Sequence, residues 1–295
     1  MSPQATGSPA LIGVRVVPAS FRLAAPIQRE VVLTCGGCPI YLAGGLDASD
    51  RSAAGVFALD PTTGRLTQLG NLVEPVHDAA GTLIPHGLVV FGGGSLSSTD
   101  LIQSFDLGTR RASIAGHLPK PLSDLSAAAF EDATYLVGGY DGVSPQRAIY
   151  RVSDSLRVRR VGSLPIGLRY PAVGTLGSNL VIAGGEAASG PVSTVYQFDT
   201  STHRVTTLGR LPAPVGHASA ITLDGRTFVA GGLDAKGRAV RTVVVVDDNG
   251  VHRLAPLARP VSDAGATEAA EVGWILGGWR GAAVAQVLRA TFTAG

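Results

Sequence analysis

Six residues with charged or aromatic side chains recur at intervals of 46 to 49 residues along this 295-residue chain. They are Arg29, Asp78, Asp124, Tyr170, His217 and Asp263. Carboxylates held close together raise one another's pKa, and Asp with His can coordinate a cation or transfer protons. The three acids fall in different repeats and need not converge, while Arg29 and His217 can neutralise them. We therefore favour a structural or solvated role for the acids over a metal or catalytic site, and we expect no metal and no cofactor.

The spacing of these residues follows an internal repeat. A Gly-Gly pair ends a short apolar run six times, and successive pairs lie 46 to 48 residues apart. The pairs are Gly44-Gly45, Gly92-Gly93, Gly138-Gly139, Gly184-Gly185, Gly231-Gly232 and Gly277-Gly278. A Leu-x-x-Pro-like turn lies about twenty residues ahead of each pair, although the fourth turn has Gly167 in place of the second Pro. Each pair is predicted to end the second of four short strands.

The third strand of each unit follows the Gly pair, as in Val56 to Asp60, and a turn at Asp60 to Gly64 leads to the fourth. Four short strands per unit favour an all-β fold. This pattern resembles the kelch-repeat family over nearly the whole chain, and the resemblance implies a six-bladed β-propeller with four-stranded blades. The sequence departs from the family at the fourth strand, where Trp is usual and this chain has Leu66, Ala112, Val158, Val205 and Val251.

The two ends of the chain are predicted to complete one blade. The last repeat stops after a strand at Gln286 to Thr293, and the apolar stretch Leu11 to Val17 can supply its missing strand. Pairing these segments closes the ring and removes two exposed sheet edges. We therefore expect a single propeller domain over residues 11–295. Residues 1–10 are rich in Ser, Pro, Ala and Gly, and are predicted to be a flexible tether. The tether either once followed a targeting or anchor segment or is a natural N-terminus.

One face of the predicted propeller carries both the Leu-x-x-Pro turns and the Gly pairs, around the mouth of the central channel. Side chains at equivalent positions differ there, which is typical of a ligand surface, although solvated residues that are free to vary would also differ. The candidate ligand-binding residues are Arg29, Asp78, Asp124, Tyr140, Arg169, Tyr170, Glu186, His217, Asp263 and Trp279.

These candidates have different expected roles. Arg29 and Arg169 would anchor an anionic ligand through paired hydrogen bonds to a carboxylate. Glu186 and His217 are the weak candidates for acid–base catalysis. Tyr140 with Trp279 would stack on a sugar, or else both pack between blades.

The two cysteines, Cys35 and Cys38, bracket a Gly-Gly pair that is predicted to form the first hairpin turn. We predict a disulfide across this turn, with free thiols as the alternative and redox or metal chemistry less favoured. A disulfide favours an oxidising compartment, so we expect an extracytoplasmic location, with the cytoplasm as the alternative.

Composition and the family resemblance together suggest two functions. The net charge is only +2, the basic residues are scattered, and no apolar run can span a bilayer, so we expect no nucleic-acid partner and no membrane insertion. Common catalytic motifs such as H-E-x-x-H and G-x-S-x-G are absent. The favoured function is a non-catalytic scaffold that presents the pore mouth to a protein or a cell-surface glycan. The alternative is a sugar-active enzyme, since kelch propellers include a sialic-acid mutarotase and galactose oxidase.

Overall fold

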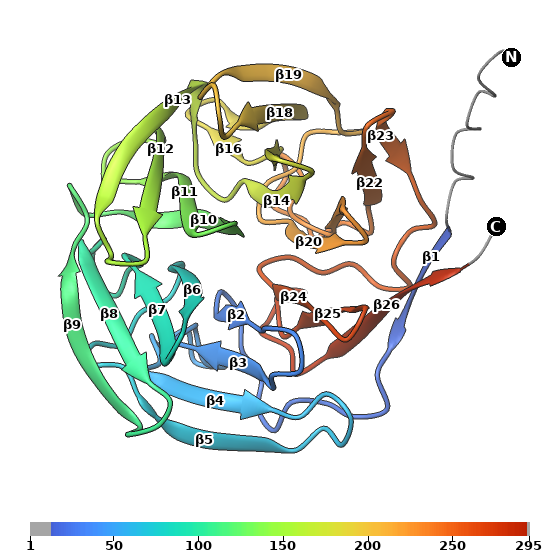
Figure 1. The fold of residues 1–295 in the computed structure, drawn as a ribbon. Helices are drawn as coiled ribbons and strands as arrows, with labels where there is room; N and C mark the ends of the chain where they lie inside the picture. The colour runs from blue at the N-terminus through green and yellow to red at the C-terminus, as the bar shows by residue number, and fades with distance from the viewer. Residues whose placement is uncertain (1–12, 294–295) are drawn as a thin grey trace, which may run out of the picture.

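The computed structural model describes residues 13–293, which form six four-stranded antiparallel sheets and one small hairpin. The sheets are arranged as blades around a central axis (Figure 1). The predicted all-β, six-bladed propeller is therefore confirmed. Within the described residues the structure has no helix of the length and apolar character that crossing a membrane requires.

Each blade runs from an inner strand beside the axis to an outer strand at the rim. Blade 1 contains β2 (Val31–Leu33), β3 (Ile40–Ala43), β4 (Gly55–Leu59) and β5 (Leu66–Asn71). Blade 2 contains β6 (Ala80–Ile84), β7 (Gly87–Phe91), β8 (Leu101–Asp106) and β9 (Arg111–His117). Blade 3 contains β10 (Ser123–Phe130), β11 (Ala133–Tyr140), β12 (Gln146–Ser153) and β13 (Val158–Leu168).

The other three blades follow the same order. Blade 4 contains β14 (Ala172–Leu176), β15 (Asn179–Ala183), β18 (Thr194–Asp199) and β19 (Val205–Arg210), with a hairpin of β16 (Glu186–Ala187) and β17 (Gly190–Pro191). Blade 5 contains β20 (Ser219–Leu223), β21 (Arg226–Ala230), β22 (Val243–Asp247) and β23 (Gly250–Arg253). Blade 6 contains β24 (Gly265–Ala269), β25 (Val272–Leu276), β26 (Val287–Thr293) and β1 (Gly13–Pro18).

The N-terminal strand closes the ring as predicted. β1 pairs antiparallel with β26 from Gly13 opposite Thr293 to Pro18 opposite Leu288, so the outer strand of blade 6 comes from the other end of the chain (Figure 1). The strand extends one residue beyond the predicted end at Val17. Leu11, the predicted start, and the predicted tether at residues 1–10 lie outside the described residues.

The Gly pairs allow each blade to approach the next one closely. Gly92 and Gly93 both have positive φ, of 59° and 93°, which glycine adopts without steric cost. The N–H of Gly93 donates to the carbonyl of Leu122, 2.8 Å away in the turn before blade 3. A Cβ on Gly92 would collide with that same carbonyl oxygen. The repeated Gly-Gly pair is therefore the backbone joint between neighbouring blades.

The apolar core is divided among the six interfaces between neighbouring blades. Between blades 1 and 2, for example, Val56 packs with Leu88 and Phe105, and all three are fully buried. Burying a side chain of this size contributes about 1.5–3 kcal/mol. Because each blade rests on two neighbours, the ring holds the turns and loops at the pore mouth in fixed relative positions.

Candidate functional site

One residue in each blade lies at the pore mouth in the same left-handed backbone conformation. The six φ values lie between 49° and 59°, a region that residues other than glycine seldom adopt. Each N–H donates to the carbonyl of the corresponding residue in the preceding blade over 2.8 to 3.3 Å, so six hydrogen bonds close a circle. These residues, called the pore ring here, are Arg29, Asp78, Asp124, Tyr170, His217 and Asp263. They are the six residues that the repeat predicted, and the face that carries them is called the ring face.

Side chains of the pore ring close over the axis. Arg29 in blade 1 and Tyr170 in blade 4 come from opposite sides, and Nη1 of Arg29 lies 3.4 Å from the Tyr170 hydroxyl. Both groups donate to the same Oδ2 of Asp78, each over 3.0 Å. Nε of Arg29 also lies 3.2 Å from Oδ1 of Asp263. Four blades thus contribute to one cluster at the centre of the mouth.

Burial and neighbouring charges set the protonation of this cluster. Burial raises the pKa of Asp78 to about 7; Asp124 and Asp263 add to the increase, while Arg29 and the Tyr170 hydroxyl oppose it. Burial also raises the pKa of Tyr170 far above its usual range, again with help from Asp78 and Asp124. The phenol is therefore a neutral hydrogen-bond donor, and its acceptor, Asp78, changes charge near neutral pH.

His217 lies between two carboxylates. Its Nδ1 lies 2.6 Å from Oδ1 of Asp263, its Nε2 lies 3.5 Å from Oε1 of Glu186, and its ring stacks on Tyr170 with 3.6 Å between centroids. Burial lowers the pKa of His217, but the hydrogen bonds to Asp263 and Glu186 outweigh it and bring the pKa to about 9. The imidazole is therefore protonated at neutral pH. Hydrogen bonding to His217 in turn lowers the pKa of Glu186.

Arg169 links the pore ring to its surroundings. Its Nε lies 2.9 Å from Oδ2 of Asp124 and 3.9 Å from Oε2 of Glu186. Its guanidinium carbon lies 4.8 Å from the ring centroids of both Tyr140 and Tyr170, a cation–π arrangement. Both predicted anchor arginines are thus already paired with carboxylates of the chain.

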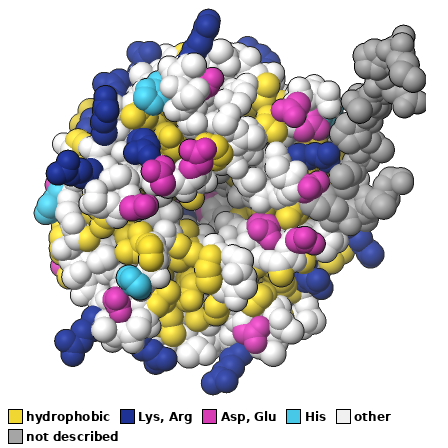
Figure 2. All heavy atoms as spheres, viewed as in Figure 1, with side chains coloured by type: hydrophobic (Ala, Val, Ile, Leu, Met, Phe, Trp, Pro, Cys, Tyr) yellow, Lys and Arg dark blue, Asp and Glu magenta, His cyan; other side chains and the backbone are white. Residues whose placement is uncertain are grey.

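A channel continues beneath the pore ring along the axis. A cavity of about 120 Å³ lies at the level of the ring and another of about 200 Å³ lies below it. The space-filling view shows the hollow at the centre of the molecule (Figure 2). Glu30 is among the residues that line both cavities, and burial raises the pKa of its carboxyl group to about 8. The channel therefore contains an acid that is neutral at neutral pH.

Sequence reasoning missed Glu30, although the repeat contains a signal for it. Glu30 directly follows a pore-ring residue, at the start of an inner strand. The equivalent residues of the other five blades are all uncharged, namely Ala79, Leu125, Pro171, Ala218 and Ala264. A residue that only had to pack would be uncharged like its five equivalents, so the single acid at this position indicates another role.

The contacts connect all the candidate ligand-binding residues except Trp279 into one network. Trp279 lies in blade 6, across the ring from Tyr140 in blade 3, and among residues 13–293 its side chain makes no ion pair or hydrogen bond to the network. Arg29 brings two of the three predicted acids, Asp78 and Asp263, to one group, whereas the third, Asp124, pairs with Arg169. In the same described range, no group of three or more His, Cys, Asp or Glu could hold a metal ion.

The predicted disulfide between Cys35 and Cys38 is present, with 5.1 Å between the two Cα atoms. It closes the turn between β2 and β3. Because β2 begins beside the pore ring and runs away from it, the disulfide lies at the opposite face. It stabilises one hairpin and does not form part of the pore mouth.

Comparison with known proteins supports the same architecture. No family model matches the chain. Beta-scruin from Limulus polyphemus is 23% identical over 72% of this chain, and the kelch repeat protein M-T8 from Myxoma virus (strain Lausanne) is 30% identical over 40%. The matched regions cover 26% and 24% of those proteins, so the chain spans about a quarter of their length. A solved structure titled "Structure of YjhT" superposes with a TM-score of 0.82 over 92% of this chain and 99% of that one, at 15% identity, which shows the fold alone.

Proposed function

Because this chain is a six-bladed propeller of the kelch-repeat family, we propose that it is an interaction scaffold whose ring face binds a protein partner. The observation that carries the proposal is a pair of exposed apolar side chains on that face. Leu96 is fully exposed and Val143 is 84% exposed, whereas most large apolar side chains of this protein are buried. Single exposed apolar side chains are common, but apolar side chains that gather within polar surroundings are typical of protein-binding surfaces.

The loops that carry Leu96 and Val143 are neighbours. Leu96 lies between β7 and β8 in blade 2, and Val143 lies between β11 and β12 in blade 3. The hydroxyl of Ser98, in the first loop, lies 3.0 Å from the Ser123 hydroxyl and donates to the carbonyl of Tyr140 over 3.2 Å. These bonds hold the two loops next to each other and beside the pore-ring network. The proposed surface therefore combines an apolar contact with polar groups that are already fixed in place, which reduces the entropy cost of binding.

A photo-crosslinking experiment tests this proposal. A photoreactive amino acid at Leu96 should capture a partner, and the same group at Arg65 on the opposite face should not. The captured partner, once purified, should bind the wild-type chain and lose at least tenfold in affinity to the variant L96D/V143D. Equal capture from both faces, or unchanged affinity of that variant, would refute the proposed surface.

A sugar-active enzyme is the second candidate, and a separate observation favours it. Asp78 and Glu30 have pKa values of about 7 and 8, close to the range that general acid–base catalysis uses, and both line the channel. A sialic-acid mutarotase activity would appear as exchange between the two anomers of N-acetylneuraminate by proton NMR. Catalysed exchange that is lost in Glu30→Gln would favour the enzyme over the scaffold, and a rate equal to that without protein would exclude this reaction.

The disulfide bears on where the scaffold acts. Disulfides persist in oxidising compartments and are rare in the cytosol. Cys35 and Cys38 are paired, and this supports our proposal that the chain acts outside the cytoplasm, where a cell-surface glycan would be an alternative partner. Thiol trapping in intact source cells tests the location, since two free thiols there would point to the cytoplasm.

A further inference from the structure

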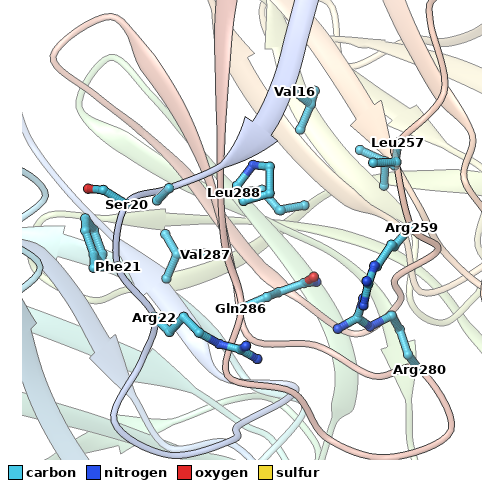
Figure 3. Close-up of a pocket in the computed structure, with 13 residues that line it drawn as sticks. Val16, Ser20, Phe21, Arg22, Leu257, Arg259, Arg280, Gln286, Val287 and Leu288 are labelled. Carbon is cyan, nitrogen blue, oxygen red and sulfur yellow. The ribbon is translucent and has the colours of Figure 1, made fainter.

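A groove at the rim of blade 6 is separate from the pore mouth. It encloses about 480 Å³ between the outer strands β1 and β26 and the turn that connects blade 5 to blade 6 (Figure 3). None of its lining residues also lines either cavity of the channel. Its volume is in the range of small-molecule sites, which is about 300–1,000 Å³.

The inner wall of the groove is apolar. It includes Val16, Phe21, Leu257, Val287 and Leu288, of which Leu257 and Val287 are almost completely buried. Phe21 is fixed from behind by stacking on Trp274, with 6.0 Å between ring centroids. The wall is therefore a preformed surface that a ligand's hydrocarbon body would cover.

Three arginines, Arg22, Arg259 and Arg280, line the mouth of this groove. Figure 3 shows Arg259 and Arg280 side by side, while Arg22 points toward Gln286 from the other side. Among residues 13–293, none of the three forms an ion pair with Asp or Glu. Most other arginines of the described residues also lack a carboxylate partner, so what distinguishes these three is that they share one groove.

The three like charges act on one another. Partial burial lowers the pKa of Arg280, and the charges of Arg259 and Arg22 lower it further. Gathering unpaired cations costs free energy that a bound anion would return. The chain's first twelve residues contain no Asp or Glu, so that segment has no carboxylate side chain to supply this anion.

We propose that this groove binds a small amphipathic carboxylate. The apolar body of the ligand covers Val16, Phe21 and Leu288, and its carboxylate accepts hydrogen bonds from the guanidinium groups at the mouth. Arg is suited to this role because its planar fork matches the two oxygens of a carboxylate. The site is independent of the ring face and of any partner bound there.

Titration with decanoate, below the concentration at which it forms micelles, tests the proposal. Isothermal titration calorimetry gives the affinity, and fluorescence gives a second readout because the protein has only two tryptophans. Trp274 stacks on Phe21, which lines the groove, so its emission should report on binding there. We expect saturable 1:1 binding of decanoate, at least tenfold weaker binding of decanol, and weaker decanoate binding as the salt concentration rises.

Variants separate the proposed site from other surfaces. R259A/R280A should lose at least tenfold in decanoate affinity. R65A removes an exposed arginine on the face opposite the ring face, and it should bind decanoate as the wild type does. R169A, on the ring face, should also keep its decanoate affinity, which distinguishes this site from the proposed partner surface. Absence of saturable binding, equal affinity for decanol, or unchanged affinity of R259A/R280A with an unchanged melting curve would overturn the proposal.

Discussion

The guanidinium group of Arg29 and the hydroxyl group of Tyr170 meet over the pore axis, 3.4 Å apart, although 141 residues separate them in the chain. They come from opposite blades, and both donate to the carboxylate of Asp78. The pore is therefore capped by side chains on the ring face, and the channel that contains Glu30 lies beneath the cap. A partner on the ring face would meet these hydrogen-bonded side chains.

Replacing Tyr170 with Phe should destabilise the protein by about 1–3 kcal/mol, because buried Asp78 loses a hydrogen-bond donor. The hydroxyl stabilises the ionised carboxylate, so the loss should be larger at pH 8, above the Asp78 pKa of about 7, than at pH 5. Urea unfolding at the two pH values measures it. Tyr140→Phe is the matched control and should change stability little. An equal loss of stability in Tyr170→Phe and Tyr140→Phe would contradict the assigned role of the Tyr170 hydroxyl.

His217 should make stability depend on pH in the alkaline range. Its pKa in the folded protein is about 9, above the ordinary 6.5, so the stability that it contributes is fully present below pH 6.5 and is lost as pH rises through 9. The shift corresponds to about 3 kcal/mol. Asp263 and Glu186 have lowered pKa values and stay ionised over this range.

The variant H217Q should therefore be less stable than the wild type at pH 6, and the difference should shrink by pH 10. Chemical unfolding across this range measures the effect. A difference that stays constant with pH would show that His217 acts through packing alone.

Removing residues 1–18 should lower the thermal midpoint by about 10 °C, because β26 loses its hydrogen-bonded neighbour and the apolar core beside blade 6 loses the buried side chain of Val14. Differential scanning calorimetry measures the midpoint. Removing only residues 1–10 is the matched control, and we expect its midpoint to stay within about 2 °C. Equal midpoints for the two truncated chains would refute the closing role of β1.

Much of this fold could be predicted from the sequence because its repeat has a mechanical cause. A Gly pair such as Gly92-Gly93 is needed wherever one blade approaches the next, so the recurring pair marks every blade. Counting from the repeat also located the pore ring. The side-chain pairings could not be predicted in this way, because whether Tyr170 reaches Asp78 across the pore depends on side-chain conformation and pore width rather than on spacing.

Other features lie outside the repeat. Glu30 was visible only as an exception to its five equivalents. The groove at blade 6 depends on where β1 ends and the chain turns at Ala19 and Ser20 toward β2. Its three arginines come from three separate turns and loops, and no local pattern in the sequence connects them.

The disulfide should contribute little to global stability. Cys35 and Cys38 enclose a very short loop, and the entropic gain from a crosslink grows with loop length, so we expect about 1 kcal/mol or less. The variant C35S/C38S should melt within about 2 °C of the wild type. Thiol labelling of the unfolded, unreduced protein should find no free thiol, and two labelled cysteines would disprove the bond.

Replacing Arg169 or Trp279 with Ala should weaken binding of a ring-face partner at least tenfold. Arg169 is 30% exposed and is held in place by Asp124 and two tyrosine rings, so a partner that contacts it meets a fixed cation. Trp279 offers a half-buried aromatic surface next to the pore mouth, and such side chains often dominate binding energy.

Loss of Arg169 also leaves the carboxylate of Asp124 buried without its cation, which lowers stability and can weaken binding indirectly. The double variant R169A/D124N removes this uncompensated charge and separates the two effects. Titration calorimetry with the captured partner should show reduced affinity in R169A, R169A/D124N and W279A, while the melting curve of the double variant returns toward the wild type. R65A, on the opposite face, should bind normally. Full affinity in both R169A/D124N and W279A would place the partner site elsewhere on the propeller.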